Sequence, residues 1–328
     1  MKKIITIIIS ACLMALGCFG LAACGNNNQN KNDKLSVVCT IFPEYDWVSE
    51  ILGENKDNVE LTLLLDNGVD LHSYQPSVQD IAKISTCDLF IYVGGESDAW
   101  VDNALKNATN KNMKVINLLE VLGDKVKTEE TVEGMEHEHE HSHEDEKEND
   151  EHVWLSLKNA EILCKKITSE LSALDKDNVA TYENNFASYK QKLATLDKGY
   201  SSAVKNAKYK TLVFGDRFPF RYLVDDYNLK YYAAFAGCSA ETEASFETIV
   251  FLAGKVDELS LPAVCTIEGR EHKIAETVRN NTTTKNQKIL TFDSMQSTTS
   301  KDVKNGVTYL SVMEKNLKVL KEALGVNA

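Results

Sequence analysis

Short apolar segments alternate with helical patterns along almost the whole chain, and this alternation restricts the fold more than any other feature. In the first half, residues 35–42, 59–65, 88–94 and 114–119 are rich in β-branched and aromatic side chains. They are apolar along their whole length rather than at every second position, which is typical of strands buried on both faces. Helical patterns separate them. The sequence therefore predicts a parallel sheet covered by helices on both faces.

The second half of the chain repeats this pattern. Apolar segments at 210–216, 230–237, 262–269 and 287–294 alternate with helical patterns at 245–260, 272–281 and 306–324. We therefore predict an α/β protein of two similar lobes, the first formed by residues 35–174 and the second by residues 207–328. Each lobe should contain a parallel sheet covered by helices.

One long amphipathic segment separates the two halves. Its apolar residues are spaced alternately by three and four positions: Val179, Tyr182, Phe186, Tyr189, Leu193, Leu196, Tyr200 and Ala203. This spacing predicts a helix over about 176–205 with one apolar seam. A coiled-coil dimer is one interpretation, although the seam is short for that. We favour a helix in the region 175–206 that lies across both lobes and joins them rigidly.

The first residues have the pattern of a secretory signal. Lys2 and Lys3 precede a short apolar run, which ends in Leu-Ala-Ala-Cys at Cys24. This ending resembles the bacterial lipobox, in which the mature chain begins at a lipidated cysteine. We predict a signal peptide at 1–23, a lipid such as palmitate on Cys24 and a flexible tether at 24–34. An uncleaved transmembrane anchor is the alternative, but the run is short for a span.

Charge and cysteine usage narrow the possible partners. The formal net charge is −13, so we expect no nucleic-acid partner. The cysteines beyond the predicted signal and lipid site are far apart and lie in mostly apolar surroundings. We interpret them as small buried hydrophobic residues rather than as ligands or a disulfide framework. They are Cys39, Cys87, Cys164, Cys238 and Cys265.

Polar residues at predicted strand ends are the candidates for a binding site. His72 lies in a loop after a strand, and His152 directly precedes a helix beside Trp154. Asp216 and Asp293 each end a strand of the second half. Open α/β sheets bind ligands at this edge, and imidazole with carboxylate suits Zn²⁺ or Mn²⁺. Solvated histidines and capping carboxylates, with Asp216 paired to Arg217, are the alternatives. Glu268 and His272, near the end of another strand, could be accessory ligands.

These segments together resemble a known family, the metal-binding substrate-binding lipoproteins of ABC transporters for zinc or manganese. VDLHSYQP at 69–76 is similar to the Asp-Pro-His-x-Tyr-x-Pro segment of that family, with Leu71 in place of proline. DEHVWLSLKNA at 150–160 is similar to the second histidine motif. The predicted long helix resembles the rigid helix that links the two lobes of that family. CSAETEASFETI at 238–249 and ILTFDSM at 289–295 are similar to segments of its second lobe.

The resemblance implies four metal ligands in a cleft between the lobes. His72 and His152 match two of them, and Asp293 falls where an aspartate ligand is common. The third ligand of the family is a histidine or glutamate after the first strand of the second lobe, where this chain reads FGDRFPFRYL and has no histidine. We assign that role to Asp216, because a charged Arg217 cannot bind a metal. Glu243, Glu268 and His272 are kept as accessory candidates.

A histidine-rich stretch precedes His152. Within residues 128–150, His137, His139, His141 and His143 alternate with acidic residues or serine. The resemblance places such a loop directly ahead of the second ligand in zinc-transporting members. A stretch with so many charges has too few apolar residues to form a core, which predicts a disordered loop. We expect its imidazoles to bind Zn²⁺ weakly near the site. A solvated acidic linker without a metal role is the alternative.

Together these features predict an extracytoplasmic zinc-binding lipoprotein of an ABC importer. It would capture Zn²⁺ between its lobes, deliver the ion to a membrane permease and catalyse no reaction. We expect a monomer anchored to the cell membrane through Cys24. A manganese or iron protein of the same class is the alternative. A secreted zinc hydrolase would need catalytic motifs that the sequence lacks. Nothing in the sequence points to an adhesin, although the fold alone would allow cell adhesion.

Overall fold

The computed structural model describes residues 34–136, 148–239, 243–269 and 272–326. The chain separates into the segment Met1–Lys34 and the compact unit Leu35–Ala328, and all elements below belong to that unit. The predicted signal peptide, Cys24 and nearly all of the predicted tether lie outside the described residues, as do the four histidines of the loop. Within the described part of the chain, no helix combines the length and apolar content needed to cross a bilayer.

The first lobe is built on a four-stranded parallel sheet with the strand order β2-β1-β3-β4. Val37 of β1 lies opposite Leu61 of β2 and Leu89 of β3. All four residues of β3 are buried, as the continuous apolar pattern predicts. The strands are β1 (Leu35–Cys39), β2 (Val59–Leu63), β3 (Leu89–Tyr92) and β4 (Lys114–Asn117). The helices are α2 (Phe42–Leu52), α3 (Val78–Thr86), α4 (Val101–Lys106), α5 (Leu118–Leu122) and α6 (Leu157–Leu174).

The second lobe has a second four-stranded parallel sheet, in the order β6-β5-β7-β8. Its first strand, β5, has an irregular register between Phe214 and Arg217, where three steps along β5 oppose two along β6. The strands are β5 (Thr211–Phe218), β6 (Lys230–Ala236), β7 (Ala263–Ile267) and β8 (Lys288–Phe292). The helices are α8 (Arg221–Asp226), α9 (Phe246–Glu258), α10 (Lys273–Asn281), α11 (Ser300–Lys304) and α12 (Tyr309–Ala323). The predicted fold class is confirmed.

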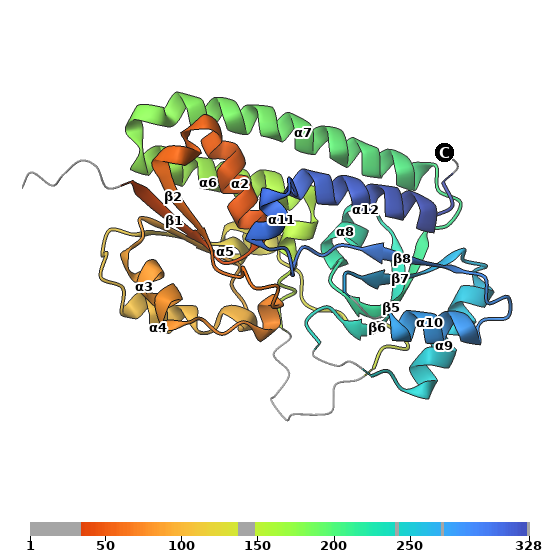
Figure 1. Cartoon of the computed structure of the whole chain (residues 1–328). Helices are drawn as coiled ribbons and strands as arrows, with labels where there is room; N and C mark the ends of the chain where they lie inside the picture. The colour runs from red at the N-terminus through yellow and green to blue at the C-terminus, as the bar shows by residue number, and fades with distance from the viewer. Residues whose placement is uncertain (1–33, 137–147, 240–242, 270–271, 327–328) are drawn as a thin grey trace, which may run out of the picture. The chain divides into compact units, whose positions relative to one another are not determined.

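The long helix α7 (Val179–Lys205) occupies the predicted position between the two sheets in the sequence. It packs against α2 and α6, which belong to the first lobe, and against α12, which follows β8 (Figure 1). Tyr182, Tyr189 and Tyr200 of its seam are buried, and the Tyr200 hydroxyl donates to the Met313 carbonyl at 2.7 Å. Since the seam is largely covered by the chain itself, the structure gives no support to a coiled-coil dimer.

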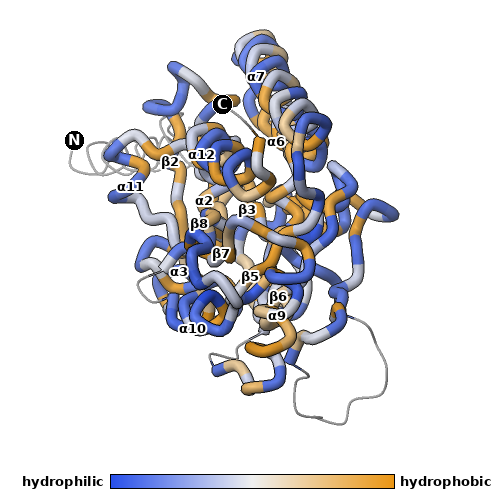
Figure 2. Tube along the Cα trace, turned by 90° about the vertical axis from the view of Figure 1, so that its right-hand side faces the viewer, coloured by the Kyte–Doolittle hydropathy of each residue, from blue (hydrophilic) through white to orange (hydrophobic). Residues whose placement is uncertain are grey.

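Serine side chains define where several helices begin. Ser77 accepts a hydrogen bond from the Asp80 amide, Ser156 from the Asn159 amide and Ser245 from the Thr248 amide. These bonds satisfy backbone donors that a helix start leaves free. Figure 2 shows hydrophobic colour along β5 and β7 and hydrophilic colour on α10 and α11, as expected for buried strands and surface helices.

Candidate metal centre

His72 lies in a short 3₁₀ turn, Leu71–Ser73, that comes after β2. Asp70 starts this turn, and its Oδ1 accepts a hydrogen bond from the His72 amide at 3.0 Å. Leu71 is buried and anchors the turn in the core, whereas 13% of the His72 side chain is exposed. The turn therefore fixes the backbone position from which the His72 imidazole extends.

His152 is completely buried, just ahead of the 3₁₀ turn Val153–Leu155 and of α6. Asp150 Oδ1 accepts from the His152 amide at 2.9 Å and lies 3.0 Å from the ring atom Nδ1. The next aromatic residue, Trp154, has its ring centroid 5.3 Å from that of His152 and donates from Nε1 to the Ser294 carbonyl at 2.8 Å. The His152 segment is thus attached to the loop after β8 in the second lobe.

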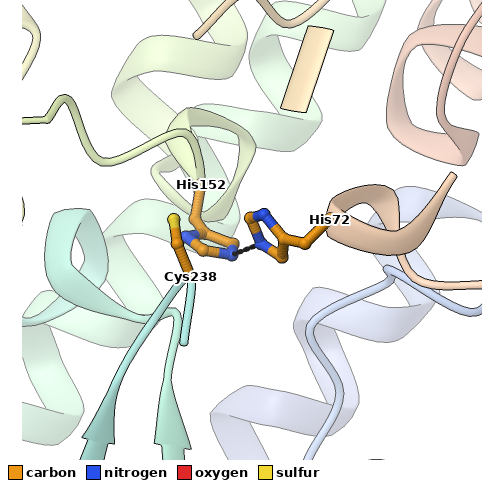
Figure 3. Close-up of side chains that lie close together, drawn as sticks. All are labelled: His72, His152 and Cys238. Carbon is orange, nitrogen blue, oxygen red and sulfur yellow. Dashed lines mark hydrogen bonds between the residues drawn. The ribbon is translucent and has the colours of Figure 1, made fainter. Parts of the chain in front are cut away.

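The two imidazoles meet although they are far apart in sequence. Their Nε2 atoms are 3.2 Å apart (Figure 3). Two nitrogen ligands of a tetrahedral zinc ion, each about 2.05 Å from the metal, lie about 3.3 Å apart. The separation seen here is therefore close to the one that a shared zinc ion requires.

The remaining ring nitrogens are held by polar neighbours. His72 Nδ1 lies 2.7 Å from Ser97 Oγ and 3.6 Å from Glu151 Oε2, while Asp150 holds Nδ1 of His152. Glu151 is buried, and its other oxygen, Oε1, accepts from the Ser97 amide at 2.9 Å. Such outer contacts orient histidines that bind metals, because they leave Nε2 directed at the ion.

The surroundings shift the pKa values of the two histidines in opposite directions. Burial, together with the charge that His152 would carry, lowers the pKa of His72 to about 3. Burial also opposes a charged His152, but the carboxylate of Asp150 outweighs it and raises the pKa of His152. His72 is therefore neutral at physiological pH, the form in which imidazole binds a metal. A hydrogen bond between the two Nε2 atoms needs a proton on one of them. The site must release this proton before both nitrogens can bind an ion.

Cys238 lies close to the two histidines, which the sequence interpretation did not expect. Among the described residues, one group of three or more potential metal ligands is found, and it consists of His72, His152 and Cys238, with one donor atom of each within 4.8 Å of the others. Cys238 lies in the turn after β6 and is only partly buried, so its interpretation as a buried hydrophobic residue is wrong. Its position after a strand and a glycine, at the ligand edge of the sheet, could have indicated it.

Asp216 is engaged inside the second lobe. Its Oδ2 accepts hydrogen bonds from Thr266 Oγ1 at 2.5 Å and from the Ile267 amide at 3.2 Å, which join β5 to β7. Its Oδ1 accepts from the Arg217 amide at 2.9 Å. The described structure does not group Asp216 with the two histidines. The guanidinium of Arg217 does not pair with it, but lies 2.6 Å from Asp70 Oδ2.

The structure does not bring the other predicted ligands into the group of His72 and His152 either. Asp293 Oδ1 accepts from the Met295 amide at 2.9 Å, and burial raises the pKa of Asp293. Glu268 accepts from the backbone and hydroxyl of Ser294, and burial with the nearby Asp293 charge raises its pKa to about 7. His272 Nδ1 lies 3.1 Å from Thr266 Oγ1, and Glu243 is exposed.

The chain is similar to known proteins of zinc uptake. The family model for the periplasmic zinc-uptake complex component A matches residues 37–323. The zinc-binding lipoprotein AdcA of Streptococcus pneumoniae is 34% identical over 98% of this chain, which spans 61% of that protein. The high-affinity zinc uptake system protein ZnuA of Bacillus subtilis is 32% identical, with 98% of this chain and 97% of that protein covered. The Zn(II)-bound ZnuA-like domain of S. pneumoniae AdcA has a TM-score of 0.69 and 31% identity, covering 89% of this chain and 99% of that domain.

Proposed function

The chain belongs to the zinc-uptake complex component A family, and from that premise we propose that it captures Zn²⁺ outside the cytoplasm for an ABC importer. The observation that supports this most directly is the pair of facing Nε2 atoms, 3.2 Å apart. Each comes from a different segment, and each ring is oriented by polar contacts at its other nitrogen. Two imidazoles prepared in this way have the spacing that zinc requires.

The protein acts by binding and release rather than by catalysis. Proteins of this family are substrate-binding components of transporters, so the hydrolase alternative from the sequence does not hold. We assign His72 and His152 as zinc ligands through Nε2. Asp293 remains a predicted oxygen ligand, and the contact of Trp154 with the Ser294 carbonyl supports it, because it attaches the segment after Asp293 to the segment of His152.

The proposal includes a location and a partner. The lipoprotein names of relatives support a membrane-attached protein outside the cytoplasm. In this proposal residues 1–23 direct export, Cys24 takes the lipid, and the unit Leu35–Ala328 works as a monomer that docks on a membrane permease. The permease then receives the ion.

The histidine-rich stretch is proposed to supply zinc to the site. The strand-like pair Thr128 and Asn149 closes the base of this stretch, and the Asp150 amide donates to the Lys127 carbonyl at 2.8 Å. His152 follows two residues later, so zinc held weakly by the imidazoles of this stretch would be released close to the site.

Isothermal titration with Zn²⁺ tests this function. The unit Leu35–Ala328 should bind one zinc ion tightly and further ions weakly, and His72→Ala should abolish the tight phase. His272→Ala is the matched control, because His272 lies outside the histidine pair and should leave that phase intact. Tight binding that survives His72→Ala would refute the proposed site. Replacing the four histidines of the loop by serine should remove weak phases only.

A further inference from the structure

We propose that Cys238 Sγ is the ligand that the second lobe supplies in place of the family's usual third ligand, giving a His₂Cys set for zinc. This inference rests on the proposed zinc-capture function and names a residue for it. Cys238 Sγ and one ring nitrogen of each histidine lie within 4.8 Å of one another. Figure 3 shows the Cys238 side chain beside the His152 ring. In a tetrahedral zinc site, sulfur and nitrogen ligands lie about 3.6 Å apart, so Sγ has to move closer to bind an ion that both Nε2 atoms share.

The turn that holds Cys238 is packed directly on His152. A Cβ at Gly237 would lie 3.1 Å from His152 Cε1 and 3.2 Å from Nδ1. Glycine therefore lets the backbone before Cys238 approach the ring this closely. From the other side, Glu129 Oε1 accepts a hydrogen bond from the Cys238 amide at 2.8 Å. Both contacts fix the backbone of the turn that carries the thiol beside the His152 ring.

Arg217 holds the same turn next to the His72 segment. Its Nη2 lies 2.6 Å from Asp70 Oδ2, and its Nη1 lies 3.4 Å from the carbonyl of Ser239. Arg217 directly follows Asp216, to which the sequence interpretation assigned the third ligand. A guanidinium cannot coordinate a cation, but here it connects the two loops that carry His72 and Cys238. We therefore assign Arg217 as a positioning residue.

The group of potential ligands found among the described residues includes the Cys238 thiol and no carboxylate. Both oxygens of Asp216 accept hydrogen bonds within the second lobe. A second observation points to an ion here. Glu151 Oε2 is buried without a hydrogen-bond partner among the described residues, and it lies 3.6 Å from His72 Nδ1. A neutral His72 bound to a cation through Nε2 would present a more acidic N–H to this carboxylate.

The donor set also sets metal preference. A thiolate is a soft ligand that favours Zn²⁺, whereas Mn²⁺ prefers carboxylate and water oxygens. A site of two imidazoles and one thiolate therefore selects zinc over manganese, whereas the two-aspartate set expected from the sequence left that choice open.

Cobalt substitution provides the test. Co²⁺ added to the unit Leu35–Ala328 should produce a near-ultraviolet thiolate-to-cobalt charge-transfer band. Cys238→Ser should lose that band and weaken zinc binding by more than about tenfold, since even outer-shell changes cost that much. Cys265→Ser is the matched control, because Cys265 is buried outside the group and the band should persist. If Cys238→Ser does not fold, the ligand role is tested by the presence of the band in the parent spectrum and its loss in Cys238→Ala.

The outcomes separate this inference from the proposed function. Tight zinc binding by the parent with no charge-transfer band, or a band that survives Cys238→Ser, would overturn the ligand role of Cys238 and leave zinc capture intact. Absence of any tight binding by the parent would overturn both. A competition titration adds a second readout: Cys238→Asp should reduce the preference for Zn²⁺ over Mn²⁺, and an unchanged preference would contradict the inference.

Discussion

At the scale of single residues, the imidazoles of His72 and His152 depend on the groups behind them. Asp150 contacts both the amide and Nδ1 of His152, so one carboxylate sets both backbone and ring orientation. Ser97 and Glu151 do the equivalent for His72. These neighbours add no ligand of their own, but they restrict which ring nitrogen is free to bind an ion.

Asp150→Asn should therefore weaken zinc binding although both ligands remain. Loss of an outer-shell carboxylate commonly costs about 10- to 100-fold in metal affinity, and we expect a change in that range. Competition with a chromophoric chelator measures it. Asp257→Asn is the control, because the Asp257 carboxylate accepts hydrogen bonds from the exposed Thr283 of the second lobe. Equal affinities of Asp150→Asn and the parent would show that this carboxylate does not orient the ring.

The two histidines could be proposed from the sequence because each lies in a recognisable local pattern. His72 lies in a loop after a strand, and His152 lies before a capped helix. Cys238 also follows a strand, but its grouping with the two histidines depends on how the turn after β6 packs on His152. Asp216 was assigned from its place at a strand end, but the irregular register of β5 brings its side chain to Thr266 of β7.

At the scale of elements, the strands were predicted to within two or three residues at either end, since long apolar runs report burial directly. The short helices α5, α8 and α11 were missed. Each has five or six residues, too few to show a helical period, and tertiary contacts rather than local sequence stabilise them. Neither the β5 irregularity nor its extension to Phe218 has a local sequence signature.

The start of α2 contains an unusual buried acid. Glu44 Oε2 accepts hydrogen bonds from Thr40 and from the Ile41 amide, while its Oε1 has no partner among the described residues. Burial, with the Asp98 charge adding to it, raises the pKa of Glu44 from 4.5 to about 8. The folded protein thus keeps a proton that the unfolded chain releases above about pH 4.5.

Because of this proton, the free energy of unfolding should fall as the pH rises. The contribution of protonated Glu44 is complete below about pH 4.5 and is lost as the pH rises towards 8, by about 1.4 kcal/mol per pH unit within that window. Glu44→Gln should remove this loss. Any deficit in the free energy of unfolding of the variant relative to the parent should therefore shrink or reverse as the pH rises. Urea unfolding at several pH values measures it. The exposed Glu54→Gln should follow the parent, and identical pH profiles for Glu44→Gln and the parent would contradict the assignment.

At the scale of the whole chain, α7 contacts helices that belong to both lobes. Tyr309, at the start of α12, adds a second link: its amide donates to Asp46 Oδ2 of α2, and its hydroxyl donates to the Trp154 carbonyl. A continuous helix and a buried hydrogen-bonded tyrosine oppose a wide hinge motion. The long helix could be predicted because its period is regular over many residues, whereas the Tyr309 contacts exist only in the fold.

Zinc should therefore bind with local loop movement only. The radius of gyration of the unit, measured by small-angle X-ray scattering with the histidine stretch 137–147 deleted, should not change on zinc addition beyond the error. Deleting this stretch in both samples removes any compaction that comes from zinc bound to its imidazoles. A decrease of several ångströms would mean that the lobes close as rigid bodies.

The most direct test of the account is a crystal structure of the zinc-bound protein with anomalous scattering at the zinc edge. An anomalous peak is expected about 2.0–2.1 Å from Nε2 of both His72 and His152. A structure in which zinc binds elsewhere, with the two imidazoles apart and directed into solvent, would contradict it.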